Sequence, residues 1–322
     1  MRLPTIACAA AIGLLLPAAA QDLRHGLVAA DAVVVGRQVA KTPHDEDVTL
    51  HVVQVVLDVR GARGASAVTV LDWPKLALHQ RPTPRQSRLY CLQDASANAA
   101  RLGLPADKGP YFKMVGFAGS NPLVGADLAA DPVVRFARLL AAGEAGAGPN
   151  ETARGLFAIA VEGDPAVRAE AARLLIERPD LRQKLDGLHW SRLIGRAVGE
   201  TDDIAYKSAL AELCAEQRLD GVFDALLVGL AEVQDPGYAA VVGRIGKGLH
   251  GEDAATKLLA RLQQTAQAER RAPLLLALGA TNTAGALDAL MRMDRKDPAV
   301  VAALKAHRDP KAQEAVAPKP AK

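Results

Sequence analysis

A short motif recurs in the second half of this chain and constrains the fold more than any other feature. Asp164-Pro165-Ala166-Val167-Arg168 matches Asp131-Pro132-Val133-Val134-Arg135 in four of five positions, 33 residues further along. The aspartate can cap a helix by accepting hydrogen bonds from the first backbone amides. Proline suits the first helical position, where its missing N–H has no intrahelical partner in any case. The motif therefore predicts two helix starts that are one repeat unit apart.

The residues after the second copy form one apolar stripe at helical spacing. The stripe consists of Val167, Ala171, Leu174 and Leu175, at i, i+4, i+7 and i+8. Further helix starts are expected at Thr201-Asp202-Asp203-Ile204, Asp235-Pro236 and Asp297-Pro298. Pairs of such helices bury one face only by stacking on their neighbours, so an array of repeats is expected over residues 123–308.

Two stretches resemble HEAT repeats. They are "DPAVRAEAARLLIE", from Asp164, and "LLLALGATNTAGALDALMRMDRKDPAVVAAL", in which Leu-Gly ends one helix and Asp-Pro-x-Val starts another. The resemblance implies an α-helical solenoid in which Asp and Arg side chains form a ladder between neighbouring repeats. The ladder residues that it implies are Asp131, Arg135, Asp164 and Arg168. An irregular helical bundle is the alternative.

Residues 21–122 instead carry short runs typical of β-strands. The runs are "ADAVVVGRQVA", "TLHVVQVVLDVRG", "AVTVL" and "SRLYCLQ", followed by a last strand from Tyr111 to Val115. Gly36 inside the first run indicates a β-bulge. Several short strands with turn residues between them predict a small closed barrel or a sandwich.

The order of these runs resembles the OB-fold-type barrels of exported bacterial proteins and the netrin (TIMP)-like barrels. Inhibitors of that family engage a metalloprotease through N-terminal cysteines, whereas Gln21-Asp22-Leu23-Arg24 contains no cysteine. The chain therefore departs from the inhibitors at the residues that inhibition requires. The fold class expected is α+β and multidomain, with a small N-terminal β-barrel followed by an α-helical HEAT-like solenoid.

The two ends of the chain are not expected to belong to either domain. Residues 1–20 have the pattern of a signal peptide, with Arg2, an apolar run from Ile6 to Leu16, and small residues before Gln21. That run is shorter than the roughly 20 apolar residues that span a membrane. We therefore expect export to the periplasm or the extracellular space and no membrane span. Residues 309–322 are expected to form a disordered tail.

A long connection between the third and fourth strands, from Asp72 to Ser87, is basic and rich in proline. Loops longer than about a dozen residues often bind ligands, and Trp beside cations can contact a polyanion or a glycan. The candidate binding residues are Trp73, Lys75, Arg81, Arg85 and Arg88. The alternative is a solvated connection that only bridges two strands.

The sequence contains no recognisable catalytic or metal-binding set. It lacks a Gly-x-Ser-x-Gly elbow, a His-Glu-x-x-His helix and a Cys-x-x-Cys pair. Gly243, Gly246 and Gly248 are interpreted as helix-packing or helix-ending residues rather than a phosphate-binding loop, because no strand precedes them. Cys91 and Cys214 lie in different predicted domains, and spacing does not decide whether they are bonded. We expect no catalytic residues, no cofactor and no metal.

These observations favour an exported, non-enzymatic scaffold that binds a protein partner through its helical array. The formal net charge of +3 is too small to indicate specific nucleic-acid binding. Two alternatives remain open. One is a binder of anionic envelope polymers or glycans through residues 72–88. The other is an enzyme or ligand-binding protein whose site forms only in the folded chain. The sequence does not identify the partner or the oligomeric state.

Overall fold

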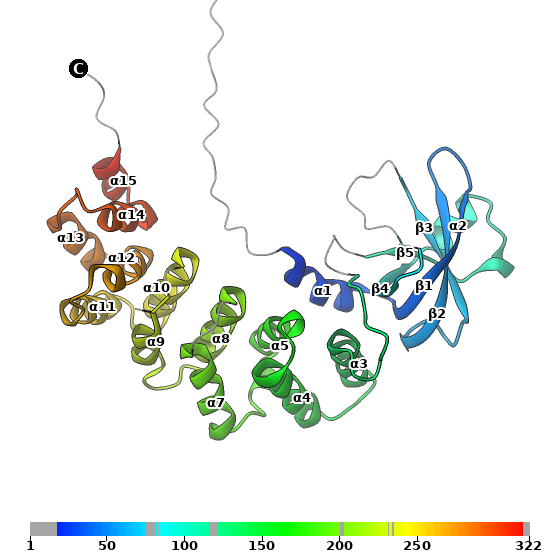
Figure 1. Cartoon of the computed structure of the whole chain (residues 1–322), viewed down its shortest axis with the longest axis horizontal. Helices are drawn as coiled ribbons and strands as arrows, with labels where there is room; N and C mark the ends of the chain where they lie inside the picture. The colour runs from blue at the N-terminus through cyan, green and yellow to red at the C-terminus, as the bar shows by residue number, and fades with distance from the viewer. Residues whose placement is uncertain are drawn as a thin grey trace, which may run out of the picture.

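The structure is a computed structural model that describes residues 18–74, 82, 84–115, 121–199, 203–230, 232–233 and 235–317. Within these residues the chain forms a closed barrel of five strands, which a succession of helices follows along a curved path (Figure 1). The predicted α+β layout, with the barrel first, is confirmed at this level.

The barrel consists of β1 (Ala32–Pro43), β2 (Thr49–Arg60), β3 (Ala67–Asp72), β4 (Ser87–Asp94) and β5 (Tyr111–Met114), close to the strands expected from the sequence. Their order around the barrel is β1-β2-β3-β5-β4. Neighbouring strands are antiparallel except β3 and β5, which are parallel. Helix α2 (Ser96–Arg101) and the 3-10 helix η1 (Ala106–Lys108) connect β4 to β5.

Gly36 lies where β1 crosses most closely over β2. A Cβ atom at this position would lie 2.5 Å from Cγ1 of Val53 and 2.7 Å from the carbonyl oxygen of Gln54. The pairing of β1 with β2 shifts register between Val35 and Gly36. The bulge expected at this glycine is therefore confirmed, and it bends β1 so that the strand pairs with both β2 and β4.

The two faces of the barrel strands belong to different cores. Inward side chains such as Val34, Val53 and Val70 form a separate apolar cluster inside the barrel. Outward side chains such as Val35 and Leu89 join the cluster that runs on through the helices. Because side chains alternate along a strand, one β1–β4 pair fills the barrel and also attaches it to the rest of the molecule.

The helices after the barrel form pairs. Their bounds are α3 Pro132–Glu144, α4 Pro149–Glu162, α5 Pro165–Glu177, α6 Pro179–Arg182, α7 Gly187–Val198, α8 Ile204–Glu216, α9 Val222–Leu230, α10 Pro236–His250, α11 Asp253–Gln264, α12 Ala268–Ala280, α13 Ala284–Arg292, α14 Pro298–Ala306 and α15 Pro310–Val316. In Figure 1, α5, α8, α10, α12 and α14 follow one another on the inner side of the curve. Their partners α4, α7, α9, α11 and α13 lie on the outer side.

Aspartate side chains start α3, α5, α8, α10 and α14 as the repeated motif predicts, whereas the inner helix α12 begins after Gln267 without a side-chain cap. Each aspartate accepts hydrogen bonds from backbone amides of the first turn, and proline follows the aspartate at all but one of these starts. The capping residues are Asp131, Asp164, Asp203, Asp235 and Asp297. Local chemistry therefore fixes where these helices begin.

Helix α1 (Ala18–Ala29) packs against both β4 and α5. It buries Leu23 and Leu27, and Arg60 of β2 donates hydrogen bonds to the carbonyl oxygens at its C-terminal end. Residues 1–17 of the predicted signal peptide lie outside the described residues, so its cleavage stays a prediction.

A buried ion cluster links α1 to α5. Glu170 of α5 is fully buried, and Nη1 of Arg173 donates to its Oε1 at 2.5 Å. Nε of Arg24, on α1, lies 3.8 Å from Oε2 of Glu170, and its Nη1 pairs with Glu177. Burial raises the pKa of Glu170, and the two arginines oppose that rise. The charge of Glu170 is therefore tolerated only while both arginines stay in place.

The C-terminal segment corrects one expectation. Residues 309–322 were expected to be disordered, but Pro310–Val316 form helix α15. Asp309 caps it by accepting from the Lys311 amide at 2.8 Å, and Ala312 is buried against the preceding helices. The Asp309-Pro310 pair is a further copy of the helix start. The prediction of disorder did not take into account the apolar residues that follow this pair. Residues 318–322 lie outside the described residues.

Glycines let the inner helices approach one another at backbone distance. A Cβ atom at Gly243 of α10 would lie 2.2 Å from the carbonyl oxygen of Ala277, and one at Gly279 of α12 would lie 2.1 Å from that of Ala303. A Cβ atom at Gly246 would lie 2.4 Å from Cζ of the Phe223 ring. The packing interpretation is confirmed for Gly243 and Gly246, whereas Gly248 faces open space.

Substitution of these glycines tests the close approach. Gly243→Ala should lower the free energy of unfolding by about 1–3 kcal/mol, because the added methyl group collides with backbone. Gly248→Ala, in the same helix, should raise it by roughly 0.5–1 kcal/mol, since alanine favours a helix and meets nothing there. Chemical denaturation measures both, and equal effects of the two substitutions would contradict the packing.

Candidate functional site

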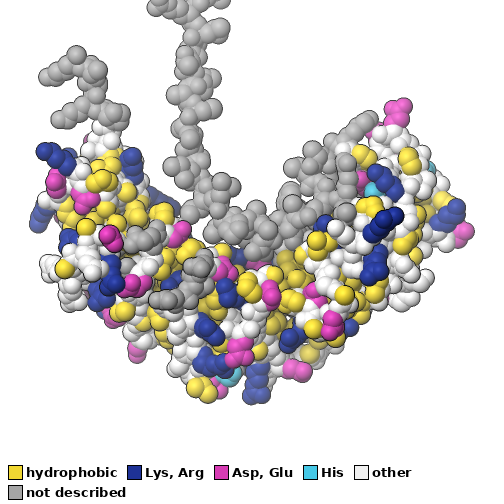
Figure 2. All heavy atoms as spheres, in the orientation of Figure 1, with side chains coloured by type: hydrophobic (Ala, Val, Ile, Leu, Met, Phe, Trp, Pro, Cys, Tyr) yellow, Lys and Arg dark blue, Asp and Glu magenta, His cyan; other side chains and the backbone are white. Residues whose placement is uncertain are grey.

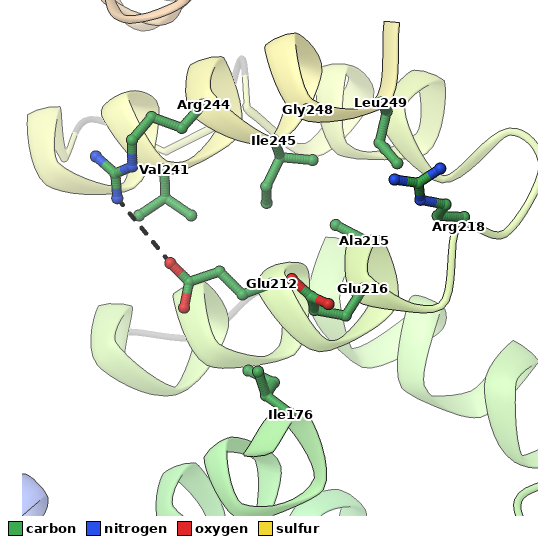
Figure 3. Close-up of a pocket in the computed structure, with 10 residues that line it drawn as sticks. All are labelled: Ile176, Glu212, Ala215, Glu216, Arg218, Val241, Arg244, Ile245, Gly248 and Leu249. Atoms are coloured by element: carbon green, nitrogen blue, oxygen red, sulfur yellow. Dashed lines mark ion pairs between the residues drawn. The ribbon is translucent and has the colours of Figure 1, made fainter. Parts of the chain in front are cut away.

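The inner layer of helices contains a hollow of about 440 Å³ between α8 and α10 (Figure 3). Its lining comes from α5, α8 and α10 and from Arg218, just beyond the end of α8. The lining residues are Ile176, Glu212, Ala215, Glu216, Arg218, Val241, Arg244, Ile245, Gly248 and Leu249. We call this hollow the α8–α10 groove.

The floor of the α8–α10 groove is aliphatic. Val241 and Ile245 point from α10 toward α8, and Ile176 of α5 lies below α8 in Figure 3. Ala215 leaves room between the two helices, since a larger side chain would fill the space that faces Ile245. The groove can therefore receive an aliphatic or aromatic side chain of a partner.

Charged side chains of both signs form the rim. Oε1 of Glu212 lies 4.0 Å from Nη2 of Arg244 at one end, and Arg218 lies near Leu249 at the other (Figure 3). Burial raises the pKa of Glu212, and Arg244 and then Arg173 oppose that rise. Among the lining residues, the groups that can bind polar atoms of a ligand are the carboxylates of Glu212 and Glu216 and the guanidinium groups of Arg218 and Arg244.

The four residues that the HEAT resemblance assigned to a ladder divide into two kinds. Asp131 and Asp164 are helix caps, and Asp131 also accepts from the Gly125 amide at 2.7 Å. Nη2 of Arg168 lies 3.2 Å from Oδ2 of Asp203, the cap of the next inner helix. Arg135 is exposed, and no ion pair of its side chain occurs among the described residues.

Tyrosines extend the contact between successive units. The guanidinium of Arg168 lies 4.2 Å from the ring centre of Tyr206, and Nζ of Lys207 lies 5.4 Å from that of Tyr238. The Tyr206 hydroxyl donates to the carbonyl oxygen of Ala160 at 2.5 Å, and Tyr238 donates to that of Ala197 at 3.5 Å. Each cation and tyrosine thus ties an inner helix to the unit before it.

The candidate binding residues of the basic connection are only partly described. Lys75 and Arg81 lie outside the described residues. Trp73 packs on the apolar cluster around Leu71 and Tyr111, and Arg85 is exposed with a positive φ of 65°. Arg88 lies inside β4, and its Nη1 donates to the carbonyl oxygen of Asn121 at 2.9 Å. The structure thus places Arg88 in the barrel wall rather than in a loop.

Surface charge differs between the two parts of the chain. Figure 2 shows acidic and basic side chains interspersed over the helices, whereas several basic side chains follow one another on the visible face of the barrel. The inner helices therefore present a mixed surface, which suits a protein partner better than a uniform polyanion.

Sites for metals and thiol chemistry are not formed by the described residues. Within them, no group of three or more His, Cys, Asp or Glu side chains is placed to hold a metal ion. Asp45 accepts from the amides of Asp47 and Val48, so the acidic stretch forms a turn. Cys91 and Cys214 are thiols, and burial raises the pKa of each to about 12, which makes them unreactive near neutral pH.

Sequence reasoning missed the α8–α10 groove. Its rim residues Glu212, Arg244 and Arg218 have no repeated spacing, and the stretch that contains them is the most irregular part of the series. Sequence reasoning also missed the buried partner of Arg24, because nothing in the sequence distinguishes Glu170 from an exposed charged residue on a helix.

Among the helices of the described residues, none has the length and hydropathy that a membrane crossing requires.

Comparisons of this chain with family models, with curated proteins and with solved structures gave no match.

Removal of the Arg168 side chain tests the contact between units. Arg168→Ala should lower the free energy of unfolding by about 1 kcal/mol, since it removes a partly buried ion pair and a cation–π contact. Arg135→Ala is the matched control from the other copy of the motif and should leave stability within about 0.5 kcal/mol. Thermal and chemical unfolding measure both. Identical curves for Arg168→Ala and the unsubstituted protein would argue against the contact.

Proposed function

We propose that this protein is an exported, non-enzymatic scaffold that binds a protein partner on the inner side of its helical array. The observation that carries the proposal is the α8–α10 groove, an aliphatic floor with charged side chains of both signs on its rim. A groove of this kind accommodates an apolar side chain of a partner while its rim pairs with polar neighbours of that side chain.

The finer description of the fold belongs to the same proposal. The helical part is an α-solenoid of HEAT type, supported by the paired helices, the repeated Asp caps and the contacts between successive inner helices. The barrel is of OB type, supported by its five-strand order with parallel β3 and β5. A solenoid offers an extended concave surface to a partner, because its units stack in one direction.

The helical part has the mixed charge and small side chains expected of a scaffold. Only 3% of the residues are aromatic, so the inner layer is built from Ala, Val, Leu and Gly that pack helices closely. Such a layer leaves a shallow groove rather than a deep pocket. Shallow apolar grooves with charged rims favour a peptide or a helix of another protein over a small molecule.

A charge reversal on the rim tests the groove. The mature protein, immobilised as bait, should retain its partner from the exported fraction, with identification by mass spectrometry. Arg244→Glu places a second acidic group beside Glu212 and should reduce recovery of that partner at least tenfold.

Arg270→Glu is the matched control, because Arg270 is also half-exposed and paired with a glutamate, Glu232, at 3.1 Å but lies outside the groove. It should retain the partner. Equal recovery by both variants would exclude the groove as the binding site.

Export is tested at the N-terminus. Expression of the full chain with residues 1–20 should release a protein that begins at Gln21, as read by N-terminal sequencing of the exported fraction. Ala18→Asp together with Ala20→Asp should block cleavage, since signal peptidases need small side chains at these positions. Retention of Met1 on the exported protein would contradict the signal peptide.

A further inference from the structure

One end of the barrel is lined by polar side chains where the rest of its interior is aliphatic. Gln38 of β1, His51 of β2, Asp72 of β3, and Arg88 and Tyr90 of β4 alternate with outward residues and so face inward. Because these strands run antiparallel, the last part of β1 and of β3 and the first part of β2 and of β4 meet at the same end. We call this region the polar end of the barrel.

Several polar atoms at the polar end are shielded from solvent and have no hydrogen-bond partner among the residues that the structure describes. They are Oε1 of Gln38, the hydroxyl of Tyr90 and Nε of Arg88. Gln38 is 8% exposed and Tyr90 is 0% exposed. Leaving such an atom without a partner destabilises the folded state, so folded proteins pair these groups with protein, water or a ligand. Three such atoms at one end of a small barrel could together pair with one polar ligand.

The charges at the polar end identify the chemistry of that occupant. Nε2 of His51 lies 3.4 Å from Oδ2 of Asp72, so the buried carboxylate already has a neighbour. No carboxylate of the described residues pairs with Arg88, and its Nη1 donates to the carbonyl oxygen of Asn121 at 2.9 Å. A partly buried guanidinium without a counter-ion favours a negative ligand.

The donors and the acceptor fit a particular type of anion. Burial raises the pKa of Tyr90 to about 12, with Arg88 opposing the rise, so the hydroxyl keeps its proton and donates. Nε–H of Arg88 is a second donor, while Oε1 of Gln38 can only accept. An oxyanion that retains one O–H group, such as hydrogen phosphate, could accept from both donors and donate to the amide.

We propose that the polar end of the barrel binds a small oxyanion of the hydrogen phosphate type, with Arg88 as counter-ion and Tyr90 as hydrogen-bond donor. This site is separate from the α8–α10 groove and does not depend on the function proposed for it. Because its atoms are shielded, the bound ion should exchange slowly with solvent.

Titration with inorganic phosphate tests the site on the full mature chain. At constant ionic strength adjusted with chloride, phosphate should raise the melting temperature and give saturable heat in calorimetry. Arg88→Gln should weaken phosphate binding roughly 10- to 100-fold, and Tyr90→Phe about tenfold, because each removes a donor to a charged group. Arg37→Gln is the matched control: Arg37 lies next along β1 from Gly36, is exposed, and donates to Ser87 at 2.7 Å.

Two results would overturn the proposal. The first is a melting temperature that responds to phosphate no more than to chloride in the unsubstituted protein. The second is a Tyr90→Phe protein that is more stable than the unsubstituted protein and whose melting temperature responds to phosphate to the same extent. That result would mean that the Tyr90 hydroxyl does not bind the anion.

If circular dichroism shows that the substituted proteins do not fold, backbone NMR of the unsubstituted protein tests whether phosphate binds at the polar end of the barrel. Phosphate should then shift the amides of residues 36–38 and 88–92. Shifts confined to the helices would place the anion elsewhere and exclude this site.

Discussion

The enclosed carboxylate of Glu170 is the most demanding interaction at the junction between the barrel and the helices, because its charge is buried. It lies between α1 and α5 with no exposed surface, and Arg24 and Arg173 supply the compensating charge. Loss of one partner of such a cluster costs several kcal/mol, because the remaining charge stays buried. Around the cluster, Leu23 and Leu27 of α1 join the outward face of the barrel to the helical core. Arg60 adds a second link, since it contacts both the end of α1 and Glu144 of α3.

Away from this junction, the helices rely on contacts that need little side-chain volume. Aspartate caps start every inner helix except α12, and glycines bring α10, α12 and α14 close to one another. This explains how a chain with so few aromatic residues forms a continuous core. It also explains the α8–α10 groove. Where the small side chain of Ala215 lies in the floor and charged side chains occupy the rim, two helices of the layer leave space between them.

Local patterns in the sequence predicted the local parts of this structure. Strand runs, the bulge at Gly36 and the Asp-Pro helix starts depend on a few neighbouring residues, and the structure contains them. The groove could not be predicted in this way, because it depends on how α8 lies against α10. The same reason hid the polar end of the barrel, where residues from four strands meet. Helix α15 was missed for a different reason: the final residues contain no core-forming side chain, and the disorder expected of them was extended back over the Asp309-Pro310 helix start.

The tyrosines of the inner helices have a consequence for how the molecule comes apart. Tyr206 and Tyr238 each reach back to a carbonyl oxygen on the outer helix of the preceding unit. An inner helix is thereby hydrogen-bonded to a helix outside its own pair, so that each unit is held by the unit before it. Peeling one unit from the end exposes the fastening of the next, so fraying should advance in steps of about one unit instead of residue by residue. When the array is pulled from its C-terminus, its units should unfold one after another. The force needed should rise at the units that contain Tyr238 and Tyr206.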